Sequence, residues 1–267
     1  MEAISKMIKA AVSRHSEMST EEYMKQQLEF ARSARGDGSC EKCNGLGLVP
    51  ELIDGYIYYR PCECSIRETN MRRLKKSGLS DLVDRYTLDR FETAEEWQKR
   101  LKQSAVNFLS NPEGWFFVGG QVGCGKTHIC TAILVELMKK GYESRYIVWP
   151  NEIIKLKANK NDDTVYSRII GPLQISKVLY IDDFFKTAAG AQNDRPSASD
   201  IKTAFEILNY RYNNRGSLIT IISTEKNIDD IIDYDEALGS RIYEMTRGVR
   251  NIIKYDKSRN YRLKREA

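Results

Sequence analysis

From about residue 86 onward, short apolar runs alternate with longer stretches in which apolar residues recur every three or four positions. The short runs predict strands, and the longer stretches predict helices. The predicted strands cover residues 115–118, 146–148, 178–181, 218–222 and 252–255, and the predicted helices cover residues 126–140, 151–158, 200–213 and 235–245. This alternation predicts an α/β fold with a mostly parallel sheet flanked by helices on both faces.

The first 80 residues follow a different pattern. We expect a helix over residues 1 to about 35, in which Ser19 and Glu22 form a capping box before a helical stripe of apolar side chains. A segment rich in glycine and cysteine follows over residues 36–64, and then a basic run over residues 67–76. Because glycine and serine interrupt the chain after this run, we predict an N-terminal region of residues 1–80 and a second domain of residues 81–267.

Composition narrows the class of protein. Hydrophobic residues make up 41% of the chain and charged residues 30%, which is ordinary for a globular protein with a core. No apolar run approaches the roughly 18 residues of a membrane span, and the start of the chain lacks a secretory signal. We therefore expect a cytoplasmic protein with no membrane partner, in which six cysteines favour metal binding or free thiols over disulfides.

A glycine-rich stretch follows the apolar run at residues 115–118. Gly120-Gln-Val-Gly-Cys-Gly-Lys-Thr127 matches G-x-x-x-x-G-K-[ST] at every fixed position. Such a loop points backbone N–H groups at phosphate oxygens, while Lys126 reaches the β and γ phosphates and the Thr127 hydroxyl binds Mg²⁺. The residues predicted to bind the nucleotide, ATP, are Gly120, Gln121, Val122, Gly123, Cys124, Gly125, Lys126, Thr127 and His128.

Two later strands end in polar residues that would lie beside this loop. The strand at residues 178–181 runs into Asp182 and Asp183. We expect Asp182 to hold Mg²⁺ and Asp183 to polarise the attacking water, with the short side chain of Asp183 limiting the rate of hydrolysis. After the strand at residues 218–222, Thr224 is predicted to contact the γ phosphate. Ser223 is the next choice for that contact, and an ordinary turn residue is the alternative.

The cysteines of the N-terminal region fall in two close pairs. Cys40 and Cys43 are separated by two residues, whereas Cys62 and Cys64 are separated by only one. Four thiolates can close a tetrahedral Zn²⁺ site, although the second spacing makes a tighter chelate than the usual one. We predict that these four residues bind Zn²⁺ and that the metal holds this small segment folded. Free structural cysteines are the alternative.

The phosphate loop, the acidic strand end and the polar strand end are followed by Leu238-Gly-Ser-Arg-Ile-Tyr243. In this order they resemble the AAA+ ATPases of the replicative helicase loader family, DnaC and DnaI and their phage relatives. The segments 209–215 and 256–263 are also similar to that family. The resemblance covers roughly residues 81–267 and implies a P-loop AAA+ ATPase domain. Because the sequence ends soon after Arg262, we expect no C-terminal helical lid.

The resemblance implies further roles and partners. Arg241 matches the arginine that reaches the ATP of a neighbouring subunit, which implies self-association and slow hydrolysis by isolated chains. Arg247, Arg250 and Arg262 are each candidates for a second sensor arginine. The cysteine segment is similar to the zinc-bearing region with which loaders of the DnaI type contact the hexameric replicative helicase. Residues 247–267 carry eight basic residues against two acidic ones, and this clustering is typical of contact with single-stranded DNA.

The function that the resemblance implies is ATP-dependent loading of the replicative helicase onto single-stranded DNA during replication initiation. One rival is a transposition helper ATPase of the IstB kind, which shares the ATPase core. The N-terminal cysteine segment makes this rival less favoured than the loader. Another rival is a nucleotide-gated helicase adaptor or inhibitor with negligible hydrolysis. The basic run at residues 67–76 is either a solvated helix face or a contact for DNA or helicase.

Overall fold

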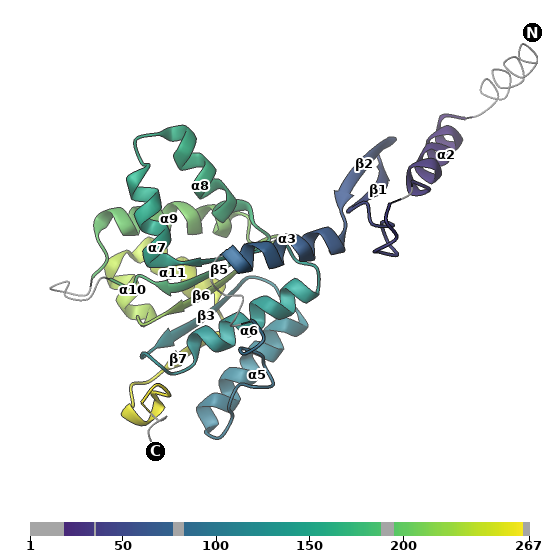
Figure 1. The fold of residues 1–267 in the computed structure, drawn as a ribbon. Helices are drawn as coiled ribbons and strands as arrows, with labels where there is room; N and C mark the ends of the chain where they lie inside the picture. Colours follow the sequence, from purple (N-terminus) through teal and green to yellow (C-terminus); the bar gives the residue numbers. More distant parts are fainter. Residues whose placement is uncertain (1–18, 35, 77–82, 188–194, 264–267) are drawn as a thin grey trace, which may run out of the picture. The chain divides into compact units, whose positions relative to one another are not determined.

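The computed structural model describes residues 19–34, 36–76, 83–187 and 195–263 (Figure 1). The chain divides into two compact units, Met1–Glu68 and Thr69–Ala267. The first 18 residues of the predicted N-terminal helix lie outside the described residues. Residues 77–82 do so as well, so the domain boundary predicted there stays a prediction. Within the described ranges, no helix is both long and apolar enough to span a bilayer.

The described part of the N-terminal unit contains one helix, a hairpin and the beginning of a second helix. Helix α2 spans Thr20–Arg32 and starts with the predicted capping box between Ser19 and Glu22. Strands β1 (Leu48–Ile53) and β2 (Tyr56–Pro61) pair antiparallel, and helix α3 (Glu63–Lys76) follows directly. Asp54 and Gly55 form the two-residue turn of the hairpin, both with positive φ, as a type I′ turn requires.

The second unit is built on a five-stranded sheet with the order β4-β5-β6-β3-β7, in which every neighbouring pair is parallel. The strands are β3 (Trp115–Gly120), β4 (Ser144–Val148), β5 (Val178–Phe184), β6 (Ile219–Thr224) and β7 (Arg250–Ile253). The prediction of a mostly parallel sheet flanked by helices is therefore confirmed. Strand β7 begins and ends two residues earlier than the sequence predicts.

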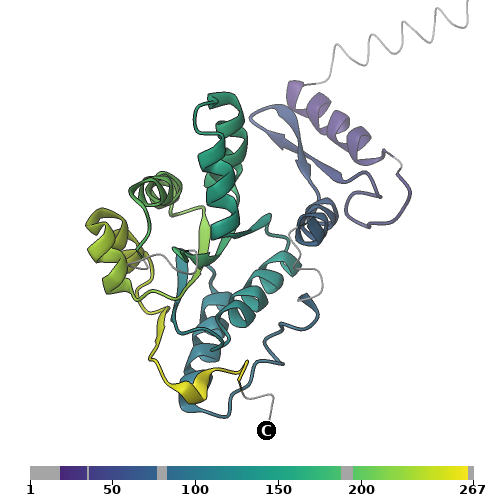
Figure 2. The same ribbon diagram turned by 60° about the vertical axis from the view of Figure 1, so that its left-hand side comes forward.

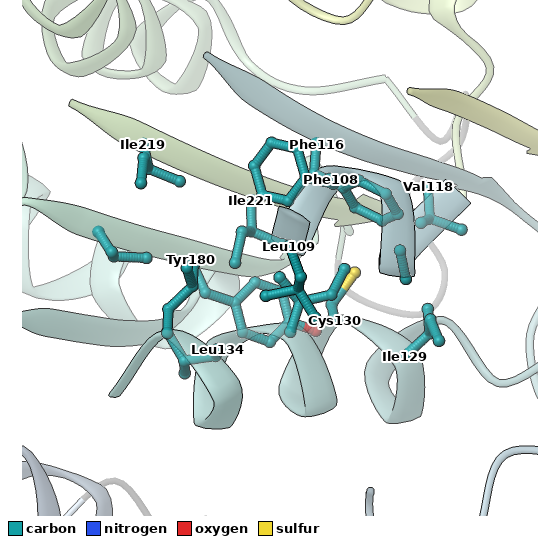
Figure 3. Close-up of a cluster of buried hydrophobic side chains, with 14 of the residues drawn as sticks. Phe108, Leu109, Phe116, Val118, Ile129, Cys130, Leu134, Tyr180, Ile219 and Ile221 are labelled. Atoms are coloured by element: carbon teal, nitrogen blue, oxygen red, sulfur yellow. The ribbon is translucent and has the colours of Figure 1, made fainter. Parts of the chain in front are cut away.

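Alternate side chains of the strands enter two separate cores. Phe116 of β3 and Tyr180 of β5 pack under helices α5 (Glu96–Ser110) and α6 (Lys126–Lys139). Figure 3 shows Phe108 of α5 beside Phe116, with ring centroids 5.3 Å apart. These side chains are almost completely buried, which is the main source of stability for such a sheet.

The opposite face of the sheet is covered by a larger group of helices (Figures 1 and 2). They are α7 (Trp149–Ala158), α8 (Asp163–Ile175), α9 (Ala198–Asn213), α10 (Ile228–Tyr234) and α11 (Glu236–Met245). Trp115 and Phe117 of β3 point into this second core. The helices that the sequence did not predict are α5, α8 and α10. A 3-10 turn, Lys257–Arg259, follows β7.

Candidate nucleotide site

The phosphate loop lies between β3 and α6, as predicted. Strand β3 is buried along its whole length and delivers Gly120 to the carboxyl edge of the sheet. Gly125, at the N-terminus of α6, has a φ of +87°, and an added Cβ there would lie 3.1 Å from the Phe91 ring. Glycine is therefore needed for the chain to turn into the helix at this position. The turn aims the N-terminus of α6 and its free N–H groups at the loop interior, which favours an anion there.

Lys126 and Thr127 are held within this loop. The Lys126 ammonium donates hydrogen bonds to the carbonyls of Gly120 and Gln121, both at 2.7 Å, so its charge is kept inside the loop. The Thr127 hydroxyl donates to Asp182 Oδ1 at 3.3 Å. The structure thus brings together the two residues predicted to hold Mg²⁺, one hydroxyl and one carboxylate, which are oxygen ligands suited to this ion.

Asp182 is fixed by several donors. Tyr146 of β4 donates its hydroxyl to Asp182 Oδ2 at 3.1 Å, and the Ser223 hydroxyl donates to Oδ1. Burial and the neighbouring carboxylate raise the pKa of Tyr146, so the phenol keeps its proton and remains a donor. The carboxylate is almost fully buried, and this set of donors satisfies its oxygens and restricts its orientation.

Asp183 is directed into the pocket by an irregularity in β5. Its φ is +53°, and the register of β5 against β6 shifts between Ile181 and Phe184. The Asp183 carboxylate accepts a hydrogen bond from Lys186 at 3.0 Å, and the same ammonium contacts Glu225 at 3.1 Å. The neighbouring carboxylates raise the pKa of Lys186 against the opposing effect of burial, so the ammonium stays charged between them. Lys186 and Glu225 are site residues that the sequence analysis missed.

The two polar residues at the end of β6 face opposite ways. Ser223 faces α6, where it contacts Asp182 and Tyr180. The Thr224 hydroxyl instead donates to the carbonyl of Phe184 at 2.6 Å and accepts from the backbone of Lys226. The role predicted for Thr224 at the γ phosphate stays a prediction. Its contacts in the structure are those of a strand-terminal turn, whereas the Ser223 hydroxyl donates to Asp182 at the end of β5.

A pocket of about 730 Å³ opens beside the loop. Its lining includes the polar side chains of Lys126, Thr127 and Asp183 and the aromatic side chains of Tyr86 and Phe91. His128 stacks on Tyr86 with ring centroids 4.8 Å apart, and His128 Nε2 lies 2.8 Å from the Thr87 carbonyl. The volume falls in the range of small-molecule sites. The lining combines cationic, polar and aromatic side chains, which suits a nucleotide.

Arg241 lies on α11 and is not among the described residues that line this pocket. Its guanidinium lies over the rings of Phe205 and Tyr212, at 5.1 and 5.3 Å, and donates to the Ala237 carbonyl at 2.6 Å. The aromatic rings give the side chain a fixed direction. The role predicted for Arg241 at the ATP of a neighbouring subunit stays a prediction.

The four predicted zinc ligands lie together in the N-terminal unit. All four sulfurs are within 4.8 Å of one another, with Cys40 and Cys62 at 3.8 Å and Cys43 and Cys64 at 3.4 Å. Tetrahedral Zn²⁺ with bonds of about 2.3 Å spaces its sulfurs by about 3.8 Å, so the cluster fits this ion. These distances exclude disulfides, whose sulfurs are about 2 Å apart.

Backbone donors around the cluster favour thiolates. The Gly47 N–H points at the Cys43 sulfur at 3.2 Å. The N–H groups of Cys43 and Lys42 lower the pKa of Cys40 to about 7, whereas the contact with Cys43 raises the pKa of Cys64 to about 12. The remaining cysteines, Cys124 and Cys130, are buried in the second unit and separate from the cluster.

Comparison with known proteins gives similarities over most of the chain. Residues 63–266 match the family described as "IstB-like ATP binding protein". Two relatives come from Bacillus subtilis (strain 168). The phage-like element PBSX protein XkdC is 36% identical over 247 residues, covering 84% of this chain and 86% of that protein. The uncharacterized protein YqaM is 33% identical over 226 residues, covering 77% of this chain and 67% of that protein.

Solved structures are similar in fold. The crystal structure of the DnaC helicase loader superposes with a TM-score of 0.52 at 24% identity, covering 66% of this chain and 99% of that one. This likeness confirms the predicted α/β fold with a mostly parallel sheet flanked by helices. The predicted resemblance to the helicase loaders is also confirmed, at the level of structural similarity.

Proposed function

Because this chain belongs to the family of IstB-like ATP-binding proteins, we propose that it is an ATP-dependent loader of a replicative DNA helicase. The observation that supports this most is the joining, in one chain, of an AAA+ nucleotide pocket and a separate unit with a four-cysteine cluster. The second unit would use ATP as a switch, and the N-terminal unit would bind the helicase. Single-stranded DNA would be the nucleic-acid partner.

Each site residue has a role in this proposal. The loop N–H groups and Lys126 bind the β and γ phosphates. Thr127 and Asp182 would hold Mg²⁺, which neutralises charge on the phosphate oxygens. Asp183 polarises the attacking water once Lys186 releases its carboxylate. Arg241 of a second copy stabilises the charge that spreads over the γ phosphoryl group. The site is then complete only between two subunits, which makes turnover depend on assembly.

The cysteine cluster would be structural in this proposal. The N-terminal unit is small, and among its described residues only Pro50 and the zinc-cluster cysteines Cys43 and Cys62 are buried. A unit with so little core gains its folding free energy from a metal. The metal would therefore fix the hairpin and the start of α3, which hold the proposed helicase-binding surface in shape.

Replacing Cys43 with serine should lower the zinc content of the purified protein from about one ion per chain to near zero, because a structural site needs all four ligands. Mass spectrometry of the native protein measures the metal directly. Cys130→Ser is the matched control, since Cys130 lies on helix α6, outside the cluster and outside the phosphate loop. Wild-type protein without zinc, or equal zinc in both variants, would show that the cluster binds none.

Association with the helicase is the direct test of the proposed function. We expect the full-length chain to co-purify with the host's replicative helicase in the presence of Mg²⁺ and ATP. The Cys43→Ser variant should lose this association, and Cys130→Ser should keep it. If wild-type protein does not bind the helicase with or without ATP, the loader function is wrong.

The family description supports a second candidate, a transposition helper ATPase. Its match begins at residue 63 and therefore covers the ATPase unit but leaves out Cys40, Cys43 and Cys62. In that function the same nucleotide site would control binding to a transposase. Capture of a transposase, with no capture of helicase, would favour this candidate.

A further inference from the structure

Three charged side chains meet at the carboxyl edge of the sheet, and all three line the pocket beside the phosphate loop. The Lys186 ammonium lies 3.0 Å from Asp183 Oδ2 and 3.1 Å from Glu225 Oε1, so it joins two carboxylates. Lys186 lies in the turn after β5, and Glu225 follows directly after β6. We call these three side chains the lysine bridge. One of its carboxylates is the group that the proposed function assigns to the attacking water.

The backbone on both sides of the lysine bridge is fixed. Phe184 and Phe185 are buried and stack with ring centroids 4.0 Å apart, and Phe185 has a φ of +57°. A residue other than glycine keeps such a backbone conformation only where its surroundings enforce it. The Thr224 hydroxyl donates to the Phe184 carbonyl at 2.6 Å and accepts from the Lys226 N–H at 3.0 Å, which ties the two turns together. Any change in the lysine bridge is therefore a change of side-chain conformation.

The side chains of the lysine bridge can exchange partners. Each is partly exposed, with 39% of the Lys186 side chain, 31% of Asp183 and 28% of Glu225 accessible to solvent. Ion pairs at such positions are weak, because water competes for the charges. The lysine side chain is flexible along its four-carbon stem. Its ammonium can therefore give up one carboxylate and keep the other.

The lysine bridge opposes the chemistry expected of Asp183. A carboxylate polarises water by accepting its hydrogen bond, and it is a weaker acceptor while an ammonium occupies one oxygen and balances its charge. Glu225 offers the ammonium a second carboxylate at nearly the same distance. Lys186 can therefore leave Asp183 without losing an ionic partner.

We propose that Lys186 and Glu225 are positioning residues that control Asp183. Lys186 holds the Asp183 carboxylate back from water, and Glu225 takes over the ammonium when Asp183 binds the attacking water. The inference rests on the nucleotide site of the proposed function and adds a control of hydrolysis within the same chain. It makes slow turnover a property of the lysine bridge as well as of assembly between chains.

Phosphate release by the purified full-length chain at saturating ATP and Mg²⁺ tests this control. Lys186→Met removes the charge and should raise the rate per chain about three- to fivefold, as expected for the loss of a partly exposed ion pair, while ATP affinity measured by calorimetry stays within about threefold. Lys186→Arg keeps the charge and should hydrolyse ATP at the wild-type rate. The matched control is Lys155→Met, because Lys155 pairs with Glu152 across the same three-residue spacing on α7, outside the pocket lining. This control should leave the rate unchanged.

Replacing Glu225 with glutamine should have the opposite effect. The ammonium then pairs with Asp183 alone, so phosphate release should fall about three- to fivefold. The double variant Lys186→Met/Glu225→Gln should match Lys186→Met, because Glu225 acts only through Lys186. A rate of Lys186→Met at or below the wild-type rate would overturn the proposal, and so would a loss from Glu225→Gln that persists in the double variant.

The result is separable from the test of the loader function. Wild-type protein that binds no ATP would remove the nucleotide site and the control of Asp183 with it. Opposite effects of Lys186→Met and Glu225→Gln in a protein that does not bind the helicase would support the lysine bridge and contradict the loader function.

Discussion

Replacing Arg241 with alanine should lower the rate of ATP turnover about 10³-fold while leaving ATP affinity within about twofold, as expected for an arginine acting on transition-state charge. We expect this difference between turnover and affinity because Arg241 is packed on Phe205 and Tyr212 and is not among the described residues that line the pocket of its own chain. Turnover is measured as phosphate release with helicase and single-stranded DNA present. Arg241→Lys should recover little, because an ammonium lacks the planar fork of a guanidinium.

Mixing two inactive variants separates action between chains from action within one chain. Lys126→Ala lacks a working loop but keeps Arg241, whereas Arg241→Ala keeps the loop. In an equal mixture about a quarter of the interfaces would pair an intact Lys126 with an intact Arg241, so activity should return to about that share of the wild-type value. No return of activity, or full turnover by Arg241→Ala alone, would contradict the proposed role.

Replacing Arg211 with alanine should lower the free energy of unfolding by about 3–5 kcal/mol, as expected when a buried charge network is broken. Arg211 is completely buried, and its guanidinium makes five hydrogen bonds. They go to the carbonyls of Leu173, Gln174, Ser176 and Ile219 and to the Thr220 hydroxyl. Burial lowers the pKa of Arg211 to about 9, so it is still charged at neutral pH.

The contacts of Arg211 explain why its replacement should lower the free energy of unfolding so strongly. The carbonyls of Leu173, Gln174 and Ser176 lie at the C-terminal end of helix α8, where the helix dipole is negative and a cation is favoured. Urea unfolding followed by the fluorescence of Trp115 and Trp149, both in the core beside α8, measures the change. Arg215→Ala is the matched control, because Arg215 is exposed just beyond helix α9, which carries Arg211, and this change should lower the free energy of unfolding by less than about 0.5 kcal/mol. A similar small cost for Arg211→Ala would contradict this account.

The central part of the fold could be predicted from the sequence because several signals agree there. An apolar strand, a glycine-rich loop and a long helix follow one another from Trp115 to Lys139, and the structure has all three. Helix α8 was missed because Gly171 and Pro172 interrupt its helical pattern. The hairpin β1–β2 was missed because much of it is exposed, although Asp54-Gly55 between two short β-prone runs is a turn signal that could have found it.

The candidate site was predicted where its residues follow a strand, and missed where distant segments meet. Asp182 could be placed beside the loop because parallel strands end at one edge. Lys186 and Glu225 come from separate loops, and only the structure brings them together at Asp183. The choice between Ser223 and Thr224 depends on which face of β6 each occupies. A one-residue change of register reverses that face, and the sequence alone does not fix it.

Calorimetric titration of the folded, full-length chain with ATP in the presence of Mg²⁺ is the most direct test of the phosphate loop. The structure predicts uptake of about one nucleotide per chain by wild-type protein and at least about 100-fold weaker binding by Lys126→Ala, which loses the ammonium inside the loop. Well-folded wild-type protein that takes up no adenine nucleotide, or equal binding by both proteins, would contradict the account.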